Sequence, residues 1–131
     1  MKIVLDASAA IPATLGIGAG SELLARVRAA SVVLAPELFV AEVANGLWKY
    51  VIAGELAIES APGALREALS LVAQFEGTAV LAVDALREAA ARRHSVYDMF
   101  YVVLARREQA TLLTLDNRMR ELAQAMNIAT A

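Results

Sequence analysis

The stretch KIVLD, residues 2–6, predicts the first strand of the fold and places an acid directly after it. Its run of large and β-branched apolar side chains is typical of a strand buried on both faces of a parallel sheet. Three further runs read in the same way: VVLAP at 32–36, AVLAVD at 79–84 and TLLTLD at 111–116. Each ends in Asp or Pro. The sequence therefore predicts at least four strands in an α/β fold.

Helical patterns lie between these strands. They cover residues 21–30, 37–53, 60–76, 85–107 and 117–126, and the fourth is broken near His94 and Ser95. This alternation predicts βαβ units with right-handed crossovers and helices on both faces of the sheet. A short strand at NIAT, residues 127–130, would be a fifth. The expected fold is a three-layer α/β/α sandwich around a mostly parallel sheet of four to five strands.

Length and composition limit the possible answers. A chain of 131 residues with 59% hydrophobic and 20% charged residues has enough apolar material for one core, so we expect a single domain over residues 1–131. The absence of cysteine excludes disulfides, zinc-thiolate sites and thiol catalysis. No apolar run reaches the roughly 18 residues of a membrane span. Asp6 interrupts any secretory signal, so a cytoplasmic location is expected.

The overall charge gives no attraction to nucleic acid. The net charge is −2 and the pI is near 5.4, so the chain as a whole has no electrostatic pull toward a phosphate backbone. If RNA or DNA is the substrate, local positive charge or a bound metal must attract it.

Two aspartates occupy positions where α/β proteins bind ligands. Asp6 follows the first expected strand and Asp116 ends the strand at 111–116. Ligands of open α/β sheets bind beyond the carboxyl ends of the strands. Asp84 also ends an expected strand, so this position alone does not identify a site. Any one of these residues could instead be the N-cap of the helix that follows.

Two further acids lie on apolar helical segments. Glu42, in PELFVAEVANGLWKYV at 36–51, has apolar neighbours around most of its helix, and Asn45 shares its side. Asp98 begins an apolar run in SVYDMFYVVLARR at 95–107. An ionised carboxylate facing a core is costly unless it is paired. Asp98 therefore either forms a capping box with Ser95 or holds a cation.

Taken together, these acids indicate a metal site. In a parallel sheet with short connections all four would reach one crevice, where they raise each other's pKa unless a cation neutralises them. Oxygen ligands without cysteine favour Mg²⁺ or Mn²⁺ over zinc. Such sites hydrolyse phosphodiesters by activating water and stabilising the leaving oxygen.

Four segments, in this order and at these separations, resemble PIN-domain proteins of the VapC toxin type. They are KIVLDASAAI, PELFVAEVANGLWKYV, SVYDMFYVVLARR and TLLTLDNRM. The resemblance covers essentially the whole chain. It implies a PIN-like α/β/α sandwich that cleaves RNA with Mg²⁺ or Mn²⁺, leaving 5′-phosphate and 3′-hydroxyl ends, as the toxin of a VapBC toxin–antitoxin pair.

The resemblance also assigns residues. The catalytic and metal-binding acids of the family fall on Asp6, Glu42, Asp98 and Asp116. Thr114 falls on the hydroxyl position of the family, and Ser8 and Asn45 are candidate supporting donors. Arg92 and Arg93 could contact phosphate or form a solvated helix face. His94 beside them has the pattern of a surface residue.

The same resemblance implies partners. Proteins of this type form homodimers and are inhibited by a cognate VapB-type antitoxin that lies in a groove near the acids. Trp48 and Tyr50 could line such a groove, since aromatic residues are enriched at binding hot spots. Their helical spacing also fits a core position, which we favour for Trp48.

Other functions remain open at this stage. A catalytically silent PIN-like RNA-binding or interaction module would be expected to have lost acids, and all four are present. A haloacid dehalogenase phosphatase needs an Asp where Ser8 stands. A receiver domain needs an acidic pair on the first strand and a late Lys, whereas the lysines are Lys2 and Lys49. A nuclease acting on DNA is not excluded.

Overall fold

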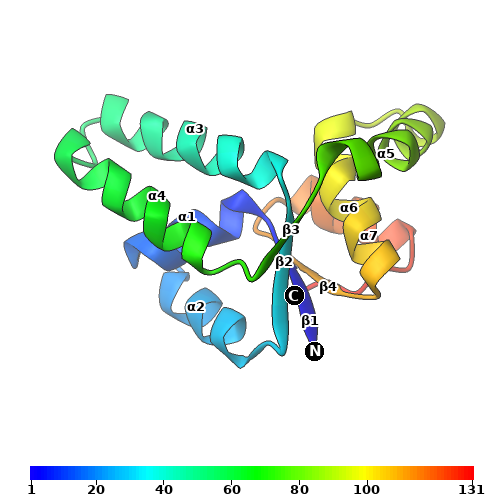
Figure 1. Ribbon diagram of the computed structural model, residues 1–131, viewed down its shortest axis with the longest axis horizontal. Coiled ribbons are helices and arrows are strands. Elements are labelled where there is room, and N and C mark those ends of the chain that lie inside the picture. The colour runs from blue at the N-terminus through cyan, green and yellow to red at the C-terminus, as the bar shows by residue number, and fades with distance from the viewer.

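A parallel sheet divides the protein into two helical layers (Figure 1). The computed structural model describes all 131 residues. The strands are β1 (Lys2–Leu5), β2 (Val32–Pro36), β3 (Gln74–Glu76) and β4 (Thr111–Leu113). They lie in the order β3-β2-β1-β4, and every pair is parallel. The predicted α/β/α sandwich with a parallel sheet is therefore confirmed.

The helices of the first half of the chain cover one face and those of the second half cover the other (Figure 1). The first layer consists of α1 (Ala7–Leu15), α2 (Gly20–Ala29), α3 (Leu38–Ile52) and α4 (Ala61–Ser70), with a 3₁₀ turn, η1, at Ile58–Ser60. The second layer consists of α5 (Thr78–Arg92), α6 (Val96–Glu108) and α7 (Asn117–Ala125). No helix is both long enough and apolar enough to cross a membrane.

The prediction of a strand at residues 79–84 is wrong, because this segment lies in the first turns of α5. Its buried residues, Leu81, Ala85 and Ala89, are spaced by four, which is the period of a helix face on a core. The third strand is instead β3, inside the range predicted as helix 60–76. As a short and largely exposed edge strand, it lacks the apolar run that marks a buried strand.

The structure also differs from two other expectations. Asp84 does not end a strand; it lies on the exposed side of α5. The NIAT segment forms no full strand, and only an isolated parallel bridge joins Thr130 to Leu112 of β4. The sheet consequently has four strands.

The core is centred on β1 and α6. Ile3, Val4 and Leu5 are completely buried because β1 has a strand on each side and helices on both faces. Every residue of α6 from Met99 to Ala105 is also buried. On the other face α3 approaches α1 closely at Gly46, where a Cβ atom would collide with the side chain of Ile11. These contacts hold the ends of β1, α3 and α6 around one opening.

Candidate functional site

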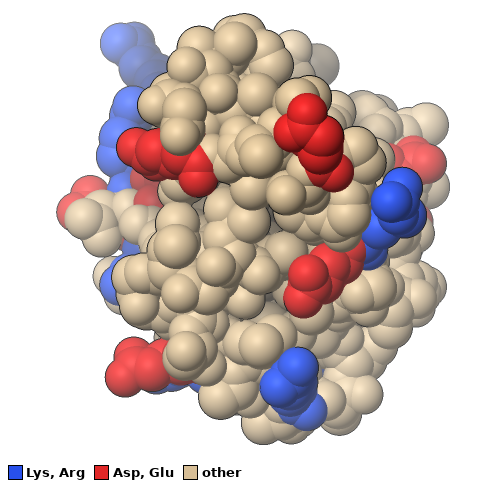
Figure 2. Space-filling view, turned by 90° about the vertical axis from the view of Figure 1, so that its left-hand side faces the viewer, with Lys and Arg blue, Asp and Glu red and all other residues tan.

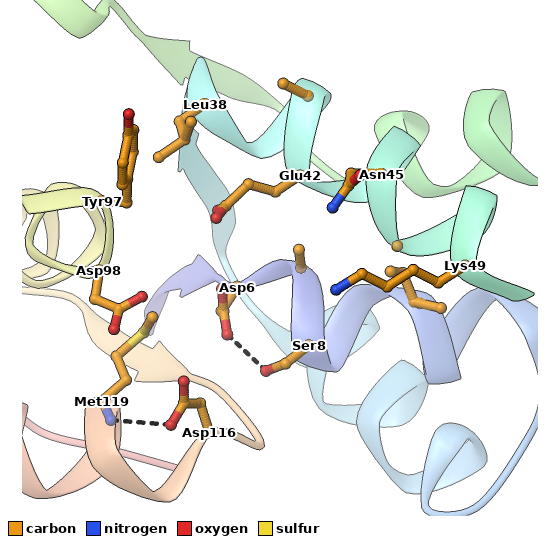
Figure 3. Close-up of a pocket in the computed structure, with 14 residues that line it drawn as sticks. Asp6, Ser8, Leu38, Glu42, Asn45, Lys49, Tyr97, Asp98, Asp116 and Met119 are labelled. Carbon is orange, nitrogen blue, oxygen red and sulfur yellow. Dashed lines mark hydrogen bonds between the residues drawn. The ribbon is translucent and has the colours of Figure 1, made fainter. Parts of the chain in front are cut away.

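A pocket of about 500 Å³ opens at the carboxyl ends of β1 and β4 (Figure 3). The four acids predicted from sequence all line it: Asp6, Glu42, Asp98 and Asp116. Asp6 follows β1, Glu42 lies in the second turn of α3, Asp98 lies in the first turn of α6, and Asp116 precedes α7. The fold thus brings together residues that are up to 110 positions apart in the sequence.

Asp6 is the most deeply buried of these acids. Its side chain is held through Oδ2, which accepts hydrogen bonds from the hydroxyls of Ser8 at 2.6 Å and Thr114 at 2.8 Å. The residue is 5% exposed, and Thr114 is fully buried. Both side-chain donors reach the same oxygen, so Oδ1 has no side-chain donor.

The two hydroxyls also tie the end of β4 to the end of β1. The Ser8 Oγ accepts the backbone N–H of Leu115 at 3.0 Å, and the Thr114 Oγ1 accepts that of Asp116 at 3.0 Å. Each hydroxyl therefore donates to the Asp6 carboxylate and accepts from the loop after β4. The predicted supporting roles of Ser8 and Thr114 have a geometric basis in this network.

Asp116 caps α7. Its Oδ1 accepts the backbone N–H groups of Arg118 at 2.9 Å and Met119 at 3.3 Å. This is the N-cap role that a single strand-terminal aspartate could have. The cap leaves Oδ2 without a hydrogen bond, so capping and a place in the pocket are compatible.

Glu42 is held from the opposite layer. The hydroxyl of Tyr101, which is fully buried on α6, donates to Glu42 Oε1 at 2.6 Å. Tyr101 lies three residues after Asp98 and so on the same side of α6. One helix therefore supplies both an acid of the pocket and the donor that orients another.

Asp98 lies against His94 at the break between α5 and α6. The Nδ1 atom of His94 is 3.8 Å from Asp98 Oδ2, and the imidazole side chain is only 11% exposed, so His94 is not the surface residue that the sequence suggested. The hydroxyl of Ser95 caps α6 through the N–H of Tyr97 at 3.2 Å. Asp98 makes no hydrogen bond to the Ser95 backbone, so the reciprocal half of the predicted capping box is absent.

The electrostatics of the pocket disfavour the ionised acids when no cation is bound. Burial raises the pKa of Asp6, Glu42 and Asp98 above their usual range. Mutual repulsion adds to this, since Asp116 raises the pKa of both other aspartates. Hydrogen bonds from Ser8 and Thr114 oppose the rise at Asp6, and the hydrogen bond from Tyr101 opposes it at Glu42.

The contacts of three of the acids follow one pattern. Asp6, Glu42 and Asp116 each accept side-chain or backbone hydrogen bonds through one oxygen and leave the other without a side-chain partner, whereas Asp98 accepts no hydrogen bond and lies 3.8 Å from His94. No three acidic or imidazole side chains are close enough to enclose a metal ion as they stand. Mg²⁺ usually keeps several waters and binds one or two carboxylates directly, so a pocket with dispersed carboxylates suits it better than a closed cage would. The donor set therefore fits a hydrated, hard divalent cation.

Only some of the other predicted residues line the pocket. Asn45 lines it, one turn after Glu42. Arg92 and Arg93 do not line it, and the Arg92 guanidinium contacts Glu88 at 3.1 Å. The structure thus gives no support to a phosphate contact by this pair.

Trp48 and Tyr50 of α3, each of which could have lined a groove or the core, have different surroundings. Trp48 is 56% exposed, so the core position that we favoured for it is wrong. It lines a separate apolar groove between α3 and α4. Tyr50 is half-buried and packs against the core.

Sequence reasoning missed three residues of the pocket region: Tyr97, Tyr101 and Lys49. Helical spacing was the available signal for two of them. Tyr101 lies three residues after Asp98, and Lys49 lies seven after Glu42, so each shares a helix face with an acid. Tyr97, adjacent to Asp98, has no such signal, because neighbours in a helix point in different directions.

Comparisons with known proteins agree with this architecture. A family described as PIN domain matches residues 3–125. PAE2754 from Pyrobaculum aerophilum has a similar structure, with a TM-score of 0.75 and 21% identity over 96% of this chain and 95% of that one. The Mycobacterium tuberculosis toxin VapC20, described as cleaving the sarcin–ricin loop, gives a TM-score of 0.71 and 19% identity over 97% and 96%. No curated protein sequence matches the chain significantly.

Proposed function

Because the chain belongs to the PIN-domain family, we propose that it is a Mg²⁺- or Mn²⁺-dependent endoribonuclease that acts as the toxin of a toxin–antitoxin pair. PIN domains are generally nucleases. The structural likeness to a toxin that cleaves RNA supports the choice of RNA as the substrate. The proposed reaction is hydrolysis of a phosphodiester bond to 5′-phosphate and 3′-hydroxyl ends.

One observation carries this proposal. Asp6, Glu42, Asp98 and Asp116 converge from four separate elements on one pocket, each with an oxygen to spare. Lys49 is the one basic residue that lines the pocket, and outside its lining His94 and Arg118 lower the pKa of Asp98 alone. Burying repelling carboxylates without a function would destabilise the fold, so their convergence favours a cation-binding role.

The four acids would hold the divalent ions. When bound, such ions supply an activated water for attack on phosphorus and charge stabilisation at the leaving oxygen. The chain's own contribution is orientation. Ser8 and Thr114 fix the Asp6 carboxylate, Tyr101 fixes Glu42, and the α7 cap fixes Asp116. Preorganised ligands of this kind avoid the cost of rearranging during the reaction.

An RNA cleavage assay tests the proposal. Purified protein is incubated with a mixed structured RNA in Mn²⁺, with EDTA and an Asp98→Asn variant as controls, and folding is checked by circular dichroism. We expect cleavage by the wild type alone. The matched control is Asp84→Asn, which removes the same charge from an exposed position on α5. Asp84→Asn should cut RNA at the wild-type rate.

Two results would contradict the proposal. Asp98→Asn cutting as fast as the wild type would assign Asp98 a structural role. A folded wild type with Mn²⁺ that leaves all RNA intact would favour a catalytically silent RNA-binding or interaction module. Including single-stranded DNA in the assay distinguishes a deoxyribonuclease.

The proposed partners are a cognate VapB-type antitoxin and a second copy of the chain. The groove between α3 and α4 supports the antitoxin, since seven of its eight lining residues are hydrophobic and Trp48 is exposed in it. Figure 2 shows the outer face of the first helical layer, where charged side chains are scattered around a broad uncharged area. An exposed apolar groove, such as the one between α3 and α4, is typical of interaction sites.

A further inference from the structure

Two side chains stand on opposite sides of the acids in the pocket (Figure 3). Lys49 projects from α3, with its ammonium group directed toward Ser8 and Asp6. Tyr97 projects from the first turn of α6, on the side of Leu38. Both line the pocket, and neither is explained by the arrangement of the acids.

Lys49 is the one basic residue that lines the pocket. It shares a face of α3 with Glu42 and Asn45 and lies two turns, about 10 Å, along the helix from Glu42. The side chain is exposed and forms no salt bridge, although four carboxylates line the same pocket. The other lysine, Lys2, is paired with Glu108 at 3.3 Å. Lys49 therefore has an ammonium group free to contact a phosphate.

Tyr97 presents an aromatic ring to solvent. It is 60% exposed, whereas Tyr101, one turn later, is completely buried. The Tyr97 backbone is fixed by the Ser95 cap, so the ring projects from a rigid helix start. Exposed aromatic rings are the usual platform on which single-stranded nucleic acids stack their bases.

The depth of the acids bears on the form of the substrate. Asp6 is only 5% exposed, whereas the side chains of Lys49 and Tyr97 are exposed. Asp6 is therefore more deeply buried than either of them. A pocket of about 500 Å³ can admit a nucleotide or an unpaired strand. Bases in a duplex are stacked on each other and cannot also stack on Tyr97.

From these observations we propose that Lys49 and Tyr97 bind one unpaired RNA strand across the pocket. Lys49 contacts a backbone phosphate on the α3 side, and Tyr97 stacks on a base on the α6 side. The scissile phosphate then lies between them, over the acids. This inference rests on the proposed function.

The test measures RNA binding and not cleavage, so that failure of this proposal can be distinguished from failure of the proposed function. A Glu42→Gln background, which keeps an oxygen acceptor for Tyr101, serves as the non-cutting parent in Mg²⁺. The probe is a short labelled RNA of mixed sequence, single-stranded or annealed to its complement. Fluorescence anisotropy gives Kd over a range of salt concentrations, and circular dichroism verifies folding.

Matched variants separate the two contacts. Tyr97→Ala should weaken single-strand binding by about 10-fold or more, and Tyr97→Phe should retain it, because stacking needs the ring and not the hydroxyl. Lys49→Gln should weaken binding at low salt and reduce the salt slope by about 0.7, the value expected for one lost phosphate contact on a single strand. Lys49→Arg should retain most of the affinity. Lys2→Gln, which removes an equal charge outside the pocket, should have no effect.

The outcomes are decisive in either direction. Loss of binding in Tyr97→Ala and Lys49→Gln with retention in the conservative variants supports the proposal. Folded variants that bind like the parent overturn it, even if the wild type cleaves RNA. Equal parent affinity for duplex and single strand overturns it as well, and so does a parent that binds no RNA.

Discussion

The acidic pocket and the apolar groove lie on opposite sides of α3 and differ in almost every physical property. The pocket side of α3 presents Glu42, Asn45 and Lys49, and hydrogen bonds fix three of the four acids of the pocket. The other side presents a groove toward α4, lined by Ala44, Leu47, Trp48, Val51, Ile58, Ala61, Pro62 and Leu65. One helix thus separates a charged, preorganised pocket from an apolar groove.

The difference indicates which kind of ligand the pocket and the groove could each bind. In the pocket, burial and mutual repulsion raise the pKa values of Asp6, Glu42 and Asp98, so a cation is the ligand that relieves the cost. In the groove, exposed apolar side chains gain free energy only when another apolar surface covers them. Substitutions on the two sides should therefore affect different measurements.

The largest effect after loss of an acid is expected for Thr114→Val. This change removes the buried hydroxyl that joins Asp6 to the N–H of Asp116. Cleavage should fall about 10- to 100-fold, as for outer-shell groups that orient metal ligands. The free energy of unfolding should fall by about 1–3 kcal/mol, since a buried N–H loses its acceptor. Cleavage rates and urea unfolding measure both.

The matched control for this variant is Thr111→Val, at the other end of β4 and outside the pocket. It should cut RNA like the wild type. Equal loss of cleavage in the two valine variants would mean that β4 needs threonine for folding and that the network around Asp6 has no special role.

Tyr101→Phe should have a smaller effect. It keeps the buried ring and removes only the hydroxyl that donates to Glu42. We expect cleavage about 10-fold slower and a loss of about 1 kcal/mol in stability. The half-buried Tyr50, which does not line the pocket, provides the control Tyr50→Phe. A Tyr101→Phe enzyme with unchanged cleavage would show that Glu42 needs no partner from α6.

The acids should give the metal-free protein an unusual dependence of stability on pH. The pKa values of Asp6, Glu42 and Asp98 lie above the ordinary 3.8 for Asp and 4.5 for Glu. Between the ordinary and the raised pKa the folded state holds more protons than the unfolded state, so the free energy of unfolding falls as pH rises. In EDTA, Tm should therefore be higher near pH 5 than near pH 7.

Added Mg²⁺ should remove this trend at neutral pH, because it binds the ionised acids of the folded state only. Asp98→Asn should show a shallower pH dependence and a smaller shift with Mg²⁺. Glu88, a partly exposed residue whose pKa is lowered by Arg106 and Arg92, acts in the opposite direction, but solvent screens that contribution. A metal-free Tm that rises steadily from acid to neutral pH would contradict the expectation.

The smallest effect on catalysis is expected in the apolar groove. Trp48→Ala should leave cleavage within about 2-fold of wild type and change stability by about 0.5–1 kcal/mol, because the side chain is largely exposed. An antitoxin that binds in the groove should inhibit this variant less well than the wild type, measured by titrating the cleavage assay. If Trp48→Ala strongly reduced cleavage in the absence of an antitoxin, the groove would not be functionally separate from the pocket.

Local patterns in the sequence predicted much of this molecule. The apolar runs at β1, β2 and β4 identified three strands, since each of these strands is largely buried and carries a continuous apolar signal. The acids were selected for their unusual positions, at strand ends or on apolar helices, and all four line one pocket. The edge strand β3 was missed because it is short and exposed, while the apolar first turns of α5 resembled a strand.

The sequence by itself determined which residue types are present and the period at which they repeat. From these follow the α/β class, the hard oxygen donors and the exclusion of thiol chemistry. Only the tertiary structure decided which oxygen of each acid is occupied, that Tyr101 reaches Glu42, and that Trp48 faces solvent. The physical reason is that these properties depend on contacts between segments far apart in the chain, and no local pattern encodes such contacts.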